Sequence, residues 1–129
     1  MKQTLAMHLR GSPDHTSTHE VAIRFAHAWL DNGHRLHSVF FSGAAAAVAH
    51  GWRQTDNKSA FDPQQQWEKL ECPLIVCANA AKRCGIISVS AAPAQQSPNH
   101  LLAPGFTIGG LGSLAEAKQM ASKFIEWVR

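Results

Sequence analysis

Three cysteines, Cys72, Cys77 and Cys84, are the residues of this chain best suited to covalent chemistry. A thiolate is the nucleophile in sulfur and disulfide exchange, so each of them is a candidate for sulfur transfer. Their C-x4-C-x6-C spacing contains no C-x-x-C redox motif and no ligand pair of the kind that zinc sites use. The odd number, together with an amino terminus too polar for a secretory signal, predicts free thiols in a reducing compartment, the cytoplasm.

Cys77 has the best position of the three. It closes the buried strand predicted over residues 73–77 and directly precedes a short helix over 78–84. Reactive groups in parallel sheets gather at the carboxyl ends of strands, and the backbone N–H groups at a helix start favour a thiolate. Lys82 and Arg83 add positive charge to the same helix.

Cys72 and Cys84 are weaker candidates. Cys72 precedes its strand at the amino end, away from the expected site. Cys84 ends its helix, where the helix dipole disfavours a thiolate. A free cysteine is commonly no more than a small buried hydrophobic residue, so an inert Cys77 is the structural alternative.

The histidines and glycines predict neither a metal nor a cofactor. His8, near the end of the first strand, is the histidine best placed to face Cys77. His15 and His19 could share a helix face, but two histidines without a third ligand do not define a metal site. The segment 110–115 fits a loose dinucleotide-binding fingerprint, yet too little chain follows it for the ribose-binding strand that the fingerprint requires.

The elements that must position Cys77 alternate between strands and helices. Strands are predicted at 2–9, 36–41, 73–77 and 123–128, and helices follow Ser17, Gly43, Asp62, Cys77 and Ser113. Near-continuous apolar strands in this alternation predict an α/β fold with a mostly parallel sheet flanked by helices. We expect one doubly wound domain over residues 1–129.

Local signals set the predicted helix starts. Ser17 with Glu20, and Ser113 with Glu116, have the spacing of capping boxes. Asp62 followed by Pro63 also predicts a helix start, with aspartate as the N-cap residue and proline at the first helical position. The polar stretches 51–61 and 88–100 are predicted to be loops.

Composition excludes several classes of protein. A chain of 129 residues that is 45% apolar can bury a core, so overall disorder is excluded. No stretch approaches the length that spans a membrane. The net charge is only +3, and the twelve Lys and Arg residues are scattered, which argues against direct binding of nucleic acid.

The segment from Cys77 to Ile86, CANAAKRCGI, resembles the active-cysteine segment of the TusD/DsrE family of sulfur-relay proteins. The glycine-rich segment 105–117, GFTIGGLGSLAEA, is similar to the same family's turn and last helix. Further matches occur in the family's order at 38–41, Phe61-Asp62, Trp67 and Leu70. The ordered set covers most of the chain.

This resemblance implies a flavodoxin-like sheet and a sulfurtransferase without a cofactor. It implies a hetero-oligomer with TusB/DsrH-like and TusC/DsrF-like subunits. Cys77 would accept sulfur as a persulfide from a TusA-like donor and pass it to a TusE/DsrC-like acceptor. The sulfur would serve either 2-thiolation of the tRNA wobble uridine or dissimilatory sulfur oxidation.

Two further functions stay open at this point. The chain could be a non-catalytic scaffold subunit of such a complex, with a structural cysteine, or a flavodoxin-like module that binds a small molecule or nucleotide. Trp and Phe residues on helix faces indicate an interface, which also allows a homo-oligomer when the chain is alone.

Overall fold

The computed structural model describes residues 2–14, 17–51, 62–86 and 102–128. Its five strands form one parallel sheet in the order β4-β3-β2-β1-β5. The strands are β1 (Thr4–Leu9), β2 (Arg35–Phe41), β3 (Leu74–Cys77), β4 (Phe106–Gly109) and β5 (Lys123–Trp127). The helices are α1 (Thr18–Asp31), the 3-10 helix η1 (Gly43–Ala49), α2 (Pro63–Glu68), α3 (Ala78–Arg83) and α4 (Leu111–Met120). The predicted parallel α/β sheet is confirmed.

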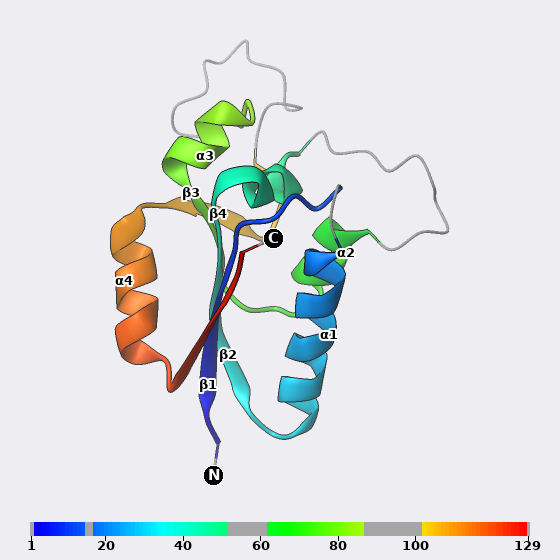
Figure 1. The fold of residues 1–129 in the computed structure, drawn as a ribbon, viewed down its shortest axis with the longest axis vertical. Helices are drawn as coiled ribbons and strands as arrows, with labels where there is room; N and C mark the ends of the chain where they lie inside the picture. Colours follow the sequence, from blue (N-terminus) through cyan, green and yellow to red (C-terminus); the bar gives the residue numbers. More distant parts are fainter. Residues whose placement is uncertain (1, 15–16, 52–61, 87–101, 129) are drawn as a thin grey trace.

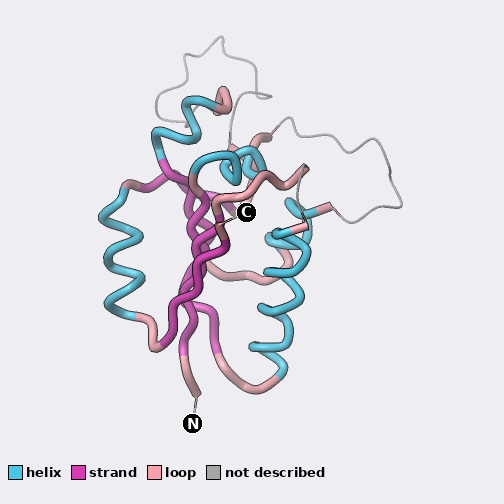
Figure 2. Tube along the Cα trace, viewed as in Figure 1, coloured by secondary structure: helices cyan, strands magenta, loops and turns pink. Residues whose placement is uncertain are grey.

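The helices cover the two faces of the sheet unequally. Figure 1 shows α1 and α2 against one face and α4 alone against the other, and Figure 2 shows the strands as the layer between them. In Figure 1, α3 lies beyond the end of β3, at the carboxyl edge of the sheet. Because all strands are parallel, this edge collects the last residue of every strand.

The core lies on the face that α1 and α2 cover. Alternate residues of β1 and β2, among them Leu9 and Phe41, point into it and are fully buried. Phe41 packs edge-on against the Trp67 ring of α2, with 5.4 Å between the ring centroids. Burial of this large indole joins α2 to the sheet.

A buried histidine connects three segments of this core. His19 of α1 is 1% exposed, and both of its ring nitrogens make hydrogen bonds. The Trp67 Nε1–H group donates to Nδ1 over 3.0 Å, so Nε2 carries the proton and donates to the Gly11 carbonyl oxygen over 2.8 Å. His19 therefore ties α1 to α2 and to the loop after β1.

The helix starts agree only in part with the sequence-based predictions. Asp62 caps α2 as predicted, because its carboxylate accepts from the Gln64 backbone N–H. The Ser17 capping box is wrong: the Ser17 hydroxyl makes no cap hydrogen bond, and Glu20 instead pairs with Arg24 over 2.8 Å. The second predicted capping box, that of Ser113 and Glu116, is also wrong, because Gly110 and not Ser113 is the N-cap residue of α4.

The helix α4 begins three residues earlier than predicted. Gly110 is its N-cap residue, so Ser113 lies within the first turn. The final strand is confirmed as β5, parallel to β1. The loops predicted over 51–61 and 88–100 lie outside the described residues, apart from Gly51. Within the described ranges, no helix has the length and apolar character needed to cross a membrane.

Replacing His19 with leucine tests the buried connection. His19→Leu leaves the Trp67 N–H group and the Gly11 carbonyl without partners, so we expect the free energy of unfolding to fall by about 2–4 kcal/mol. Urea unfolding followed by circular dichroism measures this change. The matched control is His27→Leu on the exposed face of α1, expected to change stability by at most about 0.5 kcal/mol. Equal effects of the two substitutions would contradict the structural role of His19.

Candidate functional site

Cys77 lies where three elements meet. It is the last residue of β3, pairs with Gly109 at the end of β4, and occupies the N-cap position of α3. Its side chain is half-buried and contacts the edge of the core. The predicted location of Cys77, after a buried strand and before a helix, is confirmed.

The glycine opposite Cys77 lets α4 begin close to the same point. A Cβ atom on Gly109 would lie 2.7 Å from Ile75 Cγ2 and 2.8 Å from Ser113 Oγ, closer than real Cβ contacts allow. Only a glycine therefore fits between β3 and the first turn of α4. The starts of α3 and α4, with their unpaired backbone N–H groups, both adjoin the Cys77–Gly109 pair.

One face of the sheet is open beside Cys77. Side chains alternate along a strand, so Cys77 shares the face of Ile75, which is the face that α4 covers. The helix α4 lies over β1 and β2, while Ile75 of β3 is half-buried and Thr107 of β4 is exposed. Among the described helices, α4 contacts β1 and β2, and none is placed over this half of the face.

The other two thiols have a different electrostatic environment. Burial raises the pKa of Cys72 to about 11, against a smaller opposing effect of its own backbone N–H. Burial also raises the pKa of Cys84, which is the C-cap residue of α3. Both thiols are therefore protonated at neutral pH, and a protonated thiol is a poor nucleophile.

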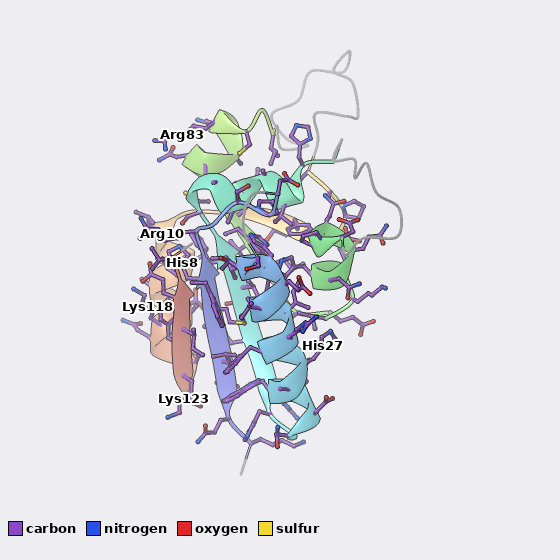
Figure 3. The ribbon with its side chains drawn as sticks, turned by 45° about the vertical axis from the view of Figure 1, so that its right-hand side comes forward. His8, Arg10, His27, Arg83, Lys118 and Lys123 are labelled. Atoms are coloured by element: carbon purple, nitrogen blue, oxygen red, sulfur yellow. The ribbon has the colours of Figure 1, made fainter. Side chains whose placement is uncertain are left out.

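Lys82 and Arg83 are exposed in the last turn of α3. Figure 3 shows Arg83 on α3, beyond His8 and Arg10. Among the described residues, neither Lys82 nor Arg83 donates a hydrogen bond to the Cys77 sulfur. Their positive charge instead complements the carboxyl end of the helix.

The prediction that His8 faces Cys77 is wrong as a direct contact, because β2 lies between β1 and β3. His8 Nε2 lies 2.7 Å from Ser42 Oγ, and Nδ1 lies 3.7 Å from a Glu126 carboxylate oxygen. Sequence reasoning missed both Ser42 and Glu126. They are far from Cys77 along the chain, and no motif marks them.

The described residues contain no group of three or more histidine, cysteine or acidic side chains that could hold a metal ion. His15 lies outside the described ranges, so the His15–His19 pair is not seen. Both ring nitrogens of His19 are already engaged by Gly11 and Trp67. A metal ligand needs a free ring nitrogen, so His19 is not placed to bind one.

Comparison with known proteins identifies the family and agrees with the fold. The profile of the DsrE/DsrF-like family matches residues 5–127. Sulfurtransferase TusD of Salmonella dublin is 36% identical over 110 residues, which cover 82% of this chain and 85% of that protein. Sulfurtransferase TusD of Salmonella newport is 34% identical over 126 residues, covering 95% and 98% of the two chains.

The crystal structure of the ychN protein from E. coli has the same fold. It superposes with a TM-score of 0.72 over 98% of this chain and 100% of that one, at 21% sequence identity. A five-stranded parallel sheet flanked by helices, of the flavodoxin-like kind, thus defines the class of fold. The chain belongs to the DsrE/DsrF-like family, which confirms the resemblance seen in the sequence.

Alkylation of the folded protein tests the difference between the three thiols. Near pH 7.5, a thiol with a pKa of about 11 is ionised in only about one molecule in a few thousand, so Cys72 should react very slowly. We expect iodoacetamide to modify Cys77 first, as measured by peptide-mapped mass spectrometry over time. Modification of Cys72 or Cys84 at the rate of Cys77 would contradict this ranking.

Substitution of Gly109 tests the close approach of α4. Gly109→Ala pushes a methyl group against Ile75 and Ser113, which should cost about 1–3 kcal/mol of stability and slow alkylation of Cys77. The control is Gly112→Ala, where a Cβ atom meets nothing within 4 Å, so stability should stay unchanged or rise. Thermal unfolding and the alkylation rate measure both effects. Unchanged values in Gly109→Ala would show that the space is not constrained.

Proposed function

We propose that this chain is a sulfurtransferase that carries sulfur as a persulfide on Cys77 in a sulfur relay. The observation that carries the proposal is the position of Cys77, half-exposed at the carboxyl edge of the sheet beside two helix starts. The raised pKa values of Cys72 and Cys84 leave Cys77 as the thiol suited to nucleophilic attack. The similarity to proteins named sulfurtransferase TusD supports the same reaction.

The reaction needs two exchanges of one sulfur atom. The Cys77 thiolate attacks the outer sulfur of a donor persulfide, a new S–S bond forms on Cys77, and the donor leaves as a thiolate. An acceptor thiolate then attacks the outer sulfur of the Cys77 persulfide, and Cys77 leaves as a thiolate. No electrons are gained or lost overall, so this chemistry requires no redox cofactor.

The surroundings of Cys77 suit a charged sulfur. A persulfide loses its proton readily, and unpaired backbone N–H groups at the starts of α3 and α4 can stabilise the anion. The open half of the sheet face gives donor and acceptor proteins access.

The proposed partners follow from the family and the surface. We propose a TusA-like donor, a TusE/DsrC-like acceptor, and assembly with TusB/DsrH-like and TusC/DsrF-like subunits in the cytoplasm. Leu111 and Met120, at the two ends of α4, are 72% and 66% exposed, which fits burial against another subunit. The delivered sulfur would serve tRNA wobble-uridine thiolation or dissimilatory sulfur oxidation.

Mass spectrometry after exposure to a persulfide donor tests the proposed function. We expect one added sulfur on the Cys77 peptide of the wild-type protein and none in Cys77→Ser. Cys84→Ser is the matched control and should load normally, because its thiol is protonated. Sulfur on Cys72 or Cys84, or none on Cys77, would contradict the carrier function and favour a non-catalytic scaffold subunit.

A further inference from the structure

Cys77 lies in a part of the chain that has no acidic residue. Residues 72–115, which include β3, α3, β4 and the first half of α4, contain no aspartate or glutamate. The same is true of residues 32–55, which include β2 and η1. Lys82 and Arg83 of α3 are the two cationic residues of the first of these stretches. The strands and helix starts that flank Cys77 therefore carry no negative charge.

A third cation, Arg10, lies in the same row of the sheet as Cys77. The strands β1 and β3 both pair with Phe41 of β2, and Arg10 and Cys77 directly follow those pairs. The Arg10 backbone N–H donates to the Trp127 carbonyl over 3.0 Å, which continues the ladder with β5. Because side chains alternate, Arg10 and Cys77 share the face that α4 covers, about 10 Å apart across two strand spacings.

Lys118 of α4 adds a fourth cation near this edge. Its Nζ atom lies over the Phe124 ring, 4.9 Å from the centroid. Burial lowers the pKa of His8 most strongly, the Glu126 carboxylate opposes this, and Arg10 and Lys118 lower the pKa further. The charges of Arg10 and Lys118 therefore act together on one point at the carboxyl edge of the sheet.

We call the side chains of Arg10, Lys82, Arg83 and Lys118 the basic face. All four are exposed, and Figure 3 shows Arg83, Arg10 and Lys118 along one side of the molecule. Among the described residues, only Arg10 of these four has an acidic partner, Glu126 at 3.4 Å. A cation that pairs with no acid of its own chain is available to an acidic side chain of another protein.

The net charge of the chain is concentrated on this side. Arg10, α3, α4 and β5 together contain the basic face and Lys123, against the two acidic residues Glu116 and Glu126. This excess of three cations equals the net charge of +3 for the whole chain. The remaining acidic and basic residues balance one another, so the positive potential is centred on the elements around Cys77.

We propose that the basic face is the docking surface for acidic side chains of the proteins that exchange sulfur with Cys77. This docking role rests on the sulfur-transfer function proposed above and gives the chemistry of its partners, aspartate and glutamate around the partner's cysteine. A thiolate and a partner's persulfide are both anions, and the cations beside Cys77 offset their repulsion and speed their encounter. A nucleic acid fits less well, because an excess of three cations is small for a phosphate backbone.

Exchange with charged peptide disulfides tests this surface without a sulfur donor. Each probe is a short peptide whose cysteine is joined to thionitrobenzoate, flanked by glutamates in one peptide and by lysines in the other. The Cys77 thiolate attacks the peptide sulfur, and thionitrobenzoate leaves as a coloured thiolate whose absorbance gives the rate. At low ionic strength we expect the glutamate peptide to react about tenfold faster, and this preference should disappear near 0.5 M salt, about the range where screening is strong. Cys77→Ser supplies the background rate.

Neutralising the charges on α3 tests their contribution. Lys82→Gln/Arg83→Gln should reduce the preference for the glutamate peptide to about twofold. The matched control is Lys2→Gln/Arg35→Gln, which removes the same charge from exposed positions at the amino edge of the sheet and should keep the preference. Alkylation by uncharged iodoacetamide should stay similar in both variants, which separates docking from a change in the Cys77 thiolate.

A variant on other elements keeps the test valid if α3 is perturbed. Arg10→Gln/Lys118→Gln leaves α3 unchanged and should also lower the preference, to about threefold. Thermal unfolding confirms that each variant is folded. An unchanged preference in both this variant and Lys82→Gln/Arg83→Gln overturns the docking surface.

The remaining outcomes separate this inference from the proposed function. Equal rates for the two peptides in the wild-type protein overturn the docking surface, even where Cys77 takes up sulfur from a persulfide donor. A preference that depends on salt and on the basic face supports it even if Cys77 takes up no sulfur, and then only the sulfur-transfer function fails. Binding of labelled tRNA in fluorescence anisotropy, lost in Lys82→Gln/Arg83→Gln, would assign the same cations to phosphates and overturn the acidic protein partner.

Discussion

The parallel hydrogen bonding of the sheet is the constraint on which the rest of the structure depends. Parallel pairing aligns the last residues of all five strands at one edge. That edge brings together Cys77 from β3, Gly109 from β4 and His8 from β1, which are far apart along the chain. An antiparallel β3 would place the thiol at the opposite edge of the sheet, away from the start of α4 and from Ser42.

The helices cover the two faces of the sheet unequally, so one face packs into the hydrophobic core and the other is partly exposed to solvent. The face covered by α1 and α2 contains the large buried aromatic residues and the hydrogen-bonded His19. Their packing and hydrogen bonds stabilise the folded state. Among the described helices, only α4 covers the opposite face, and its one buried residue is Ala117. A single helix cannot cover five strands, so Ile75, Thr107 and Cys77 keep access to solvent. The proposed exchange of a sulfur atom with other proteins requires access at this place.

The three cysteines differ in how burial affects their thiols. Removal from water penalises a thiolate, and this raises the pKa of both Cys72 and Cys84. Cys77 differs from them in its neighbours, because it lies at the start of α3 and pairs with Gly109 just before α4 begins. The three thiols are of one chemical type, and their positions in the fold give them different surroundings.

Much of this protein follows from sequence alone, because periodicity and turn chemistry are local. Four of the five strands, the capping of α2 by Asp62, and the position of Cys77 between a strand and a helix could be predicted. The strand β4 was not predicted. Two capping boxes were predicted wrongly, because Glu20 pairs with Arg24 and α4 begins at Leu111. The Ser42–His8–Glu126 cluster could not be predicted at all. It exists only because β2, β1 and β5 lie side by side, and strand order is set by packing between distant segments that no local signal encodes.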